Sequence, residues 1–168
     1  MIDEAAAADR TGADATIAAA LAEMEVGHTR RGPGEYLVTL PGTRRLSTQC
    51  WLLLREHTLL VQAFVCRRPD AEQASVYGFL LRRNARLYGV RYALDRIGDI
   101  HLIGRIPVEA VTRDELDRVL GQVLEAADGD FNTILELGFA DSIRREYAWR
   151  VDRGESTANL HAFRHLFE

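Results

Sequence analysis

The sequence contains no lysine, because all 21 of its basic residues are arginine, and 25 acidic residues give it a formal net charge of −4 at pH 7. The chain as a whole therefore has no positive field that would attract nucleic acid or an anionic membrane. Exclusive use of arginine also indicates a compositional bias, so neighbouring arginines are weak evidence for an anion site. We expect neither a nucleic-acid partner nor a membrane partner.

Cysteine is scarce, and long hydrophobic runs are missing. The two cysteines are Cys50 and Cys66. No segment approaches the roughly 18 consecutive apolar residues that a membrane-spanning helix needs. Asp3 and Glu4 stand where a secretory signal peptide carries basic residues. We therefore expect a cytoplasmic protein whose cysteines remain thiols.

Catalytic signatures are missing as well. The sequence has no P-loop, no dinucleotide-binding glycine motif after a strand, no nucleophile elbow and no zinc-protease helix motif. His161 and His165 have the spacing of a metal-binding pair, but no third ligand lies nearby in the sequence. Cys50 and Cys66 lie inside apolar runs, which favours buried thiols over nucleophiles. We predict no enzyme activity, no metal and no cofactor.

Two carboxylate pairs lie beside glycines. Asp95 and Asp99 flank Gly98, and Asp128 and Asp130 flank Gly129. Asp and Gly are also the residues that ordinary turns require, so the turn interpretation is favoured over paired acid and base catalysis.

What the sequence does contain is the composition of one globular domain. It has 168 residues, of which 47% are hydrophobic and 27% charged, enough for a core that needs no disulfide. Residues 1–13 are small, polar and acidic without a periodic apolar face, and we predict a disordered tail there. We expect an α+β domain over residues 14–127 and a helical extension over residues 128–168 that packs on the same domain.

The order of periodic segments predicts the topology. Asp14 can cap a first helix that ends near Gly27, and residues 28–34 have the composition of a loop. The remaining segments are three strands at 36–40, 48–54 and 59–66, a helix at 69–84, a strand hairpin at 87–94 and 100–106, a helix from 112 to about 128, a helical region at 131–151 with a possible break at Gly138, and a short helix after 156. This α-β-β-β-α-β-β-α order predicts a single antiparallel sheet of about five strands.

The start of the helix after residue 112 carries the clearest local signal. Thr112 and Glu115 have the spacing of a capping box, and Val111 and Leu116 occupy the positions of a hydrophobic staple.

The two central strands carry the candidate binding residues. Both faces of the segment 59–66 are substantially apolar, which implies that a helix, a second subunit or a client covers the second face. Trp51, Leu53, Leu60 and Phe64 either form part of an ordinary core or bind a partner. The strand register that would distinguish the two cannot be read from the sequence.

The segments 87–95, 98–102, 106–107 and 112–116 resemble the YbjN family of bacterial sensory transduction regulators, whose fold is similar to that of type III secretion chaperones. The segment 144–160 resembles actinobacterial members of that family. The resemblance implies a chaperone-like sheet and helix scaffold, a homodimer, and binding of other polypeptides without catalysis.

We therefore predict a non-enzymatic, chaperone-like adaptor or regulator that binds another polypeptide through apolar sheet and helix surface. The alternative is a small-molecule or nucleotide sensor that uses the arginine-rich side of the domain around Arg82 to Arg96.

Overall fold

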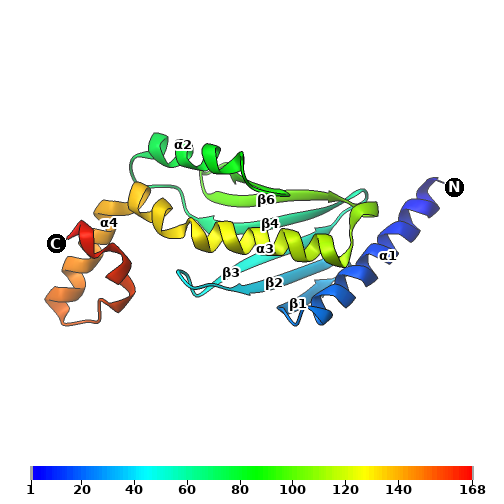
Figure 1. Ribbon diagram of the computed structural model, residues 1–168, viewed down its shortest axis with the longest axis horizontal. Coiled ribbons are helices and arrows are strands. Elements are labelled where there is room, and N and C mark those ends of the chain that lie inside the picture. Colours follow the sequence, from blue (N-terminus) through cyan, green and yellow to red (C-terminus); the bar gives the residue numbers. More distant parts are fainter. Residues whose placement is uncertain (1, 168) are drawn as a thin grey trace.

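A computed structural model of the protein describes the backbone of residues 2–167 and the side chains of residues 10–167. One six-stranded antiparallel sheet, in the order β1-β2-β3-β4-β6-β5, forms its centre (Figure 1). The strands are β1 Gly27–Gly32, β2 Glu35–Pro41, β3 Ser47–Leu54, β4 Thr58–Cys66, β5 Val90–Leu94 and β6 Ile100–Pro107. The helices are α1 Ile2–Glu23, α2 Gln73–Asn84, α3 Arg113–Gly129 and α4 Phe131–Arg153, with the 3₁₀ segments η1 Val108–Ala110 and η2 Ala158–Leu166.

The predicted α+β class, the single antiparallel sheet and both predicted hairpins are confirmed. The strand count differs by one, because the segment 28–34 that we expected to be a loop contains most of β1. This strand lies at the edge of the sheet and pairs with β2 alone. Its sequence, Gly-His-Thr-Arg-Arg-Gly, has no apolar alternation because it buries no side chain in the core, so periodicity could not reveal it.

The core lies between the sheet and the helices α1 and α3. Helix α3 runs across the sheet in contact with β2, β3, β4 and β5, and α1 lies beside it (Figure 1). Residues that alternate along the strands, such as Val38, Leu52 and Val61, are fully buried on this side. They pack with Leu116 and Val123 of α3 in one continuous cluster. Each such side chain contributes roughly 1.5–3 kcal/mol of hydrophobic stabilisation.

The predicted start of α3 is confirmed. Thr112 has an extended backbone, and its Oγ1 accepts a hydrogen bond from the N–H of Glu115 at 3.2 Å. The carboxylate of Glu115 does not complete the capping box, because it accepts hydrogen bonds from the hydroxyl of Tyr88 and from Arg118.

Helix α1 begins earlier than expected. We predicted a disordered tail over residues 1–13, whereas the helix runs from Ile2 and takes Asp14 into its interior. The alanines of this segment are strong helix formers even without an amphipathic period. Asp14 does not cap the helix, because its Oδ1 accepts hydrogen bonds from the Tyr36 hydroxyl at 2.5 Å and from the Gly34 N–H at 3.2 Å.

The C-terminal helices form one end of the molecule (Figure 1). Helix α4 is kinked at Phe139, one residue beyond the predicted break, and the Gly138 carbonyl accepts hydrogen bonds from the N–H groups of Asp70 and Ala71. Beyond the kink, Ile143 packs with residues of η2 in a small second cluster. The predicted last short helix is present as the 3₁₀ segment η2. None of the helices in residues 2–167 combines the length and apolar character that crossing a bilayer requires.

Candidate protein-binding surface

All four predicted binding residues lie on one face of the sheet. In the register of β3 and β4, Trp51 lies opposite Gln62 and Leu53 lies opposite Leu60. Residues directly opposite one another in an antiparallel pair share a face, as do alternate residues along one strand. Phe64, four residues after Leu60, therefore belongs to the same face, which we call the outer face.

The outer face carries no helix within the part of the chain that the structure describes. The alternating residues Cys50, Leu52 and Val61, which point toward α1 and α3, are fully buried. Trp51 is partly exposed and Phe64 is 45% exposed. Of the three covers that the two-sided apolar pattern allowed, a helix of this chain is thus not the one present.

The apolar character of this face continues into the neighbouring strands. Leu37 of β2 lies opposite Trp51, and Ile103 of β6 lies opposite Gln62. Together they define the outer-face stripe, which consists of Leu37, Trp51, Leu53, Leu60, Phe64 and Ile103. Charged residues adjoin it, since Glu35 pairs with Leu53 and Arg105 pairs with Leu60. An apolar patch with a charged rim is typical of a protein interaction surface.

His101 adds a polar group to one end of the stripe. Its ring meets that of Phe64 edge to face, with the centroids 5.4 Å apart, and its Nε2 lies 3.5 Å from Asp95. Its Nδ1 is buried and has no hydrogen-bond partner among the described residues. Buried polar atoms are usually satisfied, so this nitrogen is an exception among the described residues.

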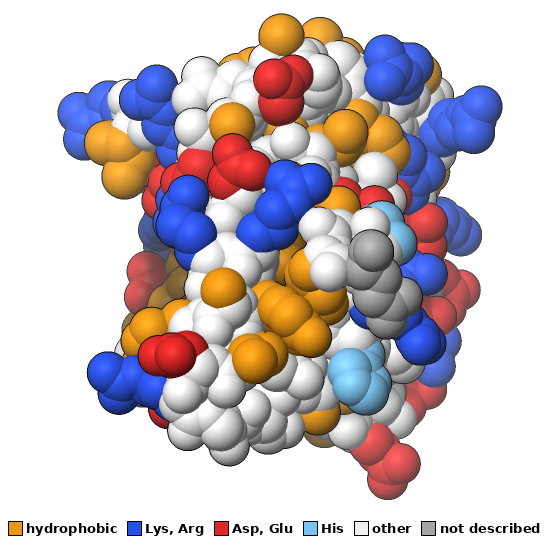
Figure 2. All heavy atoms as spheres, turned by 90° about the vertical axis from the view of Figure 1, so that its left-hand side faces the viewer, with side chains coloured by type: hydrophobic (Ala, Val, Ile, Leu, Met, Phe, Trp, Pro, Cys, Tyr) orange, Lys and Arg blue, Asp and Glu red, His pale blue; other side chains and the backbone are white. Residues whose placement is uncertain are grey.

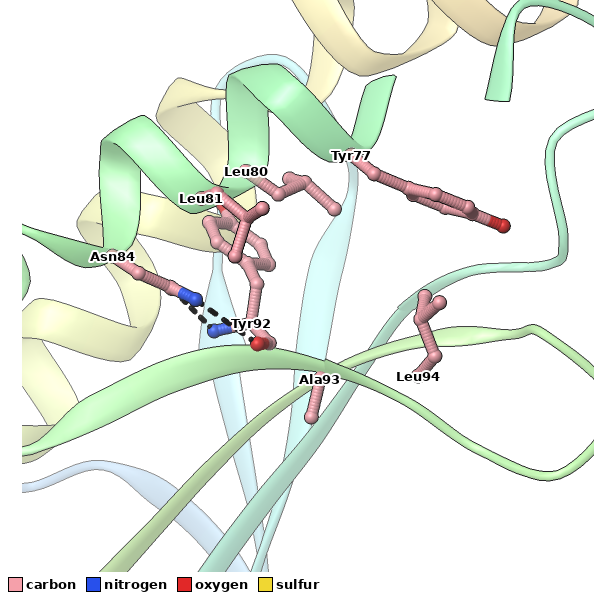
Figure 3. Close-up of a pocket in the computed structure, with 7 residues that line it drawn as sticks. All are labelled: Tyr77, Leu80, Leu81, Asn84, Tyr92, Ala93 and Leu94. Atoms are coloured by element: carbon pink, nitrogen blue, oxygen red, sulfur yellow. Dashed lines mark hydrogen bonds between the residues drawn. The ribbon is translucent and has the colours of Figure 1, made fainter. Parts of the chain in front are cut away.

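A second apolar region lies at the β5 edge of the sheet and was missed by sequence reasoning. A pocket of about 220 Å³ between α2 and β5 is lined by Tyr77, Leu80, Leu81, Asn84, Tyr92, Ala93 and Leu94 (Figure 3). We call it the α2–β5 pocket. The side chain of Asn84 holds α2 against β5, because its amide and carbonyl groups bond both backbone polar groups of Tyr92.

Exposed apolar side chains lie near this pocket. Leu81, near the end of α2, is 70% exposed. Ile97, in the turn between β5 and β6, is also 70% exposed. Only the position of α2 relative to β5 reveals that these residues belong to one region.

Both cysteines are buried, as predicted, and remain thiols. Burial raises the pKa of Cys50 to about 12. Burial likewise raises the pKa of Cys66 to about 11, although Arg45 and Arg67 nearby lower it. Such thiols carry almost no thiolate near neutral pH and are poor nucleophiles.

The two aspartate pairs have different structural roles. Asp95 forms the predicted turn, because its Oδ1 accepts the N–H groups of Ile97 and Asp99 at 2.9 Å. Asp128 and Asp130 lie at the predicted turn, between α3 and α4, but both also bind distant segments, which the sequence did not indicate. Asp130 accepts hydrogen bonds from Arg83 at 2.7 Å and from the Tyr92 hydroxyl at 2.9 Å.

Asp128 secures the loop between β2 and β3. Its Oδ1 accepts the backbone N–H groups of Thr43, Arg44 and Arg45 at 2.9–3.0 Å, and its Oδ2 accepts the Thr43 hydroxyl at 2.8 Å. Burial alone would raise the pKa of this carboxyl, but the hydrogen bonds from Arg45 and Thr43 outweigh it and hold the pKa at about 2.

The arginines between residues 82 and 96 do not act as one cluster. Arg83 is paired with Glu125 and Asp130, and Arg91 donates to the carbonyls of Leu87 and Val90. Five arginines lie in this segment, and two of them are therefore occupied by internal contacts.

The histidine pair near the C-terminus lies on the surface. His161 and His165 are both exposed, and His165 lies 3.5 Å from Glu136. Within the described residues, no three His, Cys, Asp or Glu side chains are placed to hold a metal ion.

Two solved structures are similar to this one in fold. The Yersinia pestis type III secretion chaperone SycH, in complex with a stable fragment of YscM2, matches 68% of this chain and 96% of its own at a TM-score of 0.52 and 18% identity. A chain of the ExoU–SpcU complex from the type III secretion system of Pseudomonas aeruginosa matches 72% of this chain and 96% of its own, at a TM-score of 0.51 and 17% identity. The fold is therefore that of the type III secretion chaperones.

Sequence comparison gives nearer relatives. The uncharacterized protein Rv0487 of Mycobacterium tuberculosis is 57% identical over 141 residues, which cover 83% of this chain and 77% of that protein. The uncharacterized protein ML2442 of Mycobacterium leprae is 57% identical over 132 residues, covering 79% and 72%. The sequence model of the YbjN family, described as "Putative bacterial sensory transduction regulator", matches residues 13–136. That match spans the sheet, the outer-face stripe and the helices that cover the core, and the chain belongs to the YbjN family.

Proposed function

We propose that this protein is a non-enzymatic, cytoplasmic, chaperone-like adaptor or regulator that binds another polypeptide through the outer-face stripe. The observation that carries the proposal is a sheet with one face covered by α1 and α3 and an opposite, apolar face that no described helix covers. A partner's apolar side chains would supply the missing cover.

The composition of the stripe suits a protein interface. Trp51 and Phe64 are the large aromatic side chains that dominate binding energies when a partner desolvates them. Arg105 and Glu35, at the rim, are placed to set register and orientation through charge.

The structural neighbours support a polypeptide as the ligand. SycH was solved with a fragment of YscM2 bound, and ExoU–SpcU is a heterodimeric complex. Both are thus associated with a second polypeptide. The neighbours support the class of ligand and leave its identity to experiment.

We further propose that the protein is a homodimer, joined through the α2–β5 pocket and the free edge of β5. This edge carries Leu81, Leu94 and Ile97, which are apolar and at least 47% exposed. A two-fold arrangement brings the same patch from both copies together, which suits a surface that is apolar rather than of one charge. The outer-face stripe of each copy then remains free for the partner.

Affinity capture from the native cytosol, washed at physiological salt, tests the adaptor. Wild-type protein is expected to return a near-stoichiometric protein partner, and Phe64→Ser and Trp51→Ser are expected to lose it. Leu46→Ser is the matched control, because Leu46 is an apolar side chain, 95% exposed, in the loop between β2 and β3.

Each variant is checked by circular dichroism and thermal unfolding, so that loss of the partner is interpreted only for folded protein. Return of the bait alone, or partner binding that persists in both folded stripe variants, would contradict the proposal.

A further inference from the structure

A cavity of about 470 Å³ lies where β4 ends against α4 and η2, at the end of the molecule shown in Figure 2. Figure 2 shows hydrophobic side chains gathered near the middle of this end, with basic side chains around them. The large apolar side chains of the cavity wall are those of Phe64, Phe131, Leu135, Phe139, Ile143 and Leu160. This volume accommodates an aromatic or leucine side chain with room for a neighbouring group.

The cavity contains one cation without an ion-pair partner. The guanidinium of Arg45 lies 4.9 Å from the centre of the Phe131 ring and donates to the Val65 carbonyl at 3.0 Å. Among residues 10–167, no carboxylate oxygen lies within 4.0 Å of it. Asp128 is close, but it accepts the backbone N–H of Arg45 rather than the guanidinium.

The environment of Arg45 is unfavourable for an isolated charge. Burial lowers the pKa of its guanidinium, although Cys66 and Asp128 act in the opposite direction. A partly buried cation that keeps most of its N–H donors free is stabilised when a carboxylate pairs with it, and guanidinium suits two parallel hydrogen bonds.

The other charged groups of the cavity wall already have partners. Arg67 lies over the Phe139 ring at 4.7 Å and is paired with Asp70 through both carboxylate oxygens. Glu146 is paired with Arg150 at 2.6 Å. The unbalanced charge is therefore positive and is located at Arg45.

We propose that the Arg45 cavity binds a segment of the partner polypeptide in which an aromatic or leucine side chain stands next to Asp or Glu. The apolar side chain fills the space between the phenylalanines, and the carboxylate pairs with the Arg45 guanidinium. The proposal rests on the adaptor function. It adds the sequence class that the adaptor selects.

The position of Phe64 connects this cavity with the outer-face stripe. Phe64 belongs to the stripe by its register on β4 and also lines the cavity. A bound segment can therefore cross the outer face and place its acidic residue at Arg45 without leaving apolar surface.

Selection of a random 12-residue peptide display library against the full-length protein tests the proposal. Enriched peptides are expected to carry Asp or Glu beside Phe, Tyr, Trp or Leu. An enriched peptide is then labelled with fluorescein and titrated by fluorescence anisotropy. Arg45→Gln is expected to weaken its binding by at least about tenfold, the effect of removing a charge-assisted hydrogen bond.

Two controls separate the cavity from general charge and from folding. Arg31→Gln makes the same change of charge on the exposed strand β1 and is expected to leave the affinity unchanged. Replacing the peptide's acidic residue by its amide leaves the protein untouched. It is expected to weaken binding to wild type by about the same factor, with little further loss on Arg45→Gln.

The outcomes distinguish this proposal from the adaptor function. An empty selection, enriched peptides without an acidic residue, or equal affinity for wild type and Arg45→Gln would overturn the cavity proposal. If the captured partner is still lost in Trp51→Ser, whose side chain belongs to the stripe and does not line the cavity, the adaptor stands without the cavity proposal. Peptide binding that depends on Arg45, with no partner captured from the cytosol, would instead contradict the adaptor.

Discussion

Asp128 holds together two segments that are more than 80 residues apart in the chain. Its buried carboxylate accepts three backbone N–H groups from the loop between β2 and β3. These N–H groups lie between β2 and β3, outside the hydrogen bonds of the strands, so the carboxylate of Asp128 is what holds the loop in place. The loop also positions Arg45, which links this aspartate to the cavity at the end of β4.

Asp128→Ala is expected to lower the free energy of unfolding by about 2 kcal/mol, the cost of losing hydrogen bonds to a charged group. Urea denaturation at pH 7 measures it. Asp141→Ala is the control, because Asp141 is exposed and makes only a local pair with Arg144. Equal stabilities of the two variants would contradict this role.

The contribution of Asp128 also depends on pH. Its pKa of about 2 in the folded protein lies below the value of about 3.9 expected in the unfolded chain. The stabilisation is therefore complete above about pH 4 and is lost as the pH falls toward 2. We expect the stability difference between wild type and Asp128→Asn, measured in urea, to narrow over that range. If the difference in stability between wild type and Asp128→Asn stayed constant from pH 5 to pH 2.5, the low pKa of Asp128 would be contradicted.

Cys50 and Cys66 are expected to resist alkylation in the folded protein, because burial raises the pKa of both thiols. Iodoacetamide labelling at pH 8, followed by mass spectrometry, should give rates far below that of free cysteine, and unfolding in urea should restore them. Rapid labelling of either thiol in native protein would show a reactive site that burial does not explain.

At the level of single residues, sequence reasoning succeeded where the cause was local. The cap at Thr112 was predicted because its donor lies three residues away, and the cysteines were predicted buried because their strand neighbours are apolar. It could not show that Asp14 and Asp128 bind residues 20 or more positions away in the chain. Asp and Gly in sequence look the same whether they form a turn or anchor a remote loop.

The elements follow from the sequence to the extent that they bury one face. Helix α3 and strands β2 to β6 carry the expected apolar period and were predicted. Strand β1 and the first turns of α1 have no such period, and they were assigned to a loop and a tail. Strand β1 depends on its hydrogen bonds to β2, and these are invisible in the pattern of side chains.

The turn between β1 and β2 requires glycine at position 34. Gly34 has a φ of +70°, and a Cβ there would lie 2.8 Å from the Cβ of Leu54. Gly34→Ala is therefore expected to destabilise the protein by about 1–3 kcal/mol. Gly121→Ala is the matched substitution in the exposed interior of α3, where a Cβ meets nothing within 4 Å. It should stabilise by about 0.5–1 kcal/mol.

Urea denaturation of the two glycine variants measures both expected changes in the free energy of unfolding, a decrease for Gly34→Ala and an increase for Gly121→Ala. Destabilisation by Gly121→Ala would mean that α3 is more crowded than its contacts indicate. An unchanged stability for Gly34→Ala would mean that the turn relaxes to accept a side chain.

At the level of the whole molecule, the sequence correctly indicated two apolar faces on the central strands. It could not indicate that Trp51, Leu53, Leu60 and Phe64 share a face, because that depends on the pairing register of β3 and β4. The α2–β5 pocket was beyond reach because it depends on how α2 packs against β5, and the Arg45 cavity because its wall comes from elements far apart in the chain.

The proposed dimer makes a prediction at this scale. Leu81→Asp places a charge in the α2–β5 region and is expected to yield a monomer at micromolar concentration, measured by light scattering coupled to size-exclusion chromatography. Leu46→Asp introduces the same charge on another exposed leucine and should remain dimeric. A monomeric wild type, or a dimeric Leu81→Asp, would contradict the proposed interface.

The two edge strands of the sheet, β1 and β5, differ in how readily a further strand can pair with them. Strand β1 is polar, carries Arg30 and Arg31, and has a bulge between Arg30 and Gly32. Charge and irregular pairing discourage the addition of a further strand. A sheet that can be extended only at β5 stops growing once two copies have met there. In the proposed dimer the two edges that remain are both β1 strands, which disfavours open-ended fibrils even at high concentration.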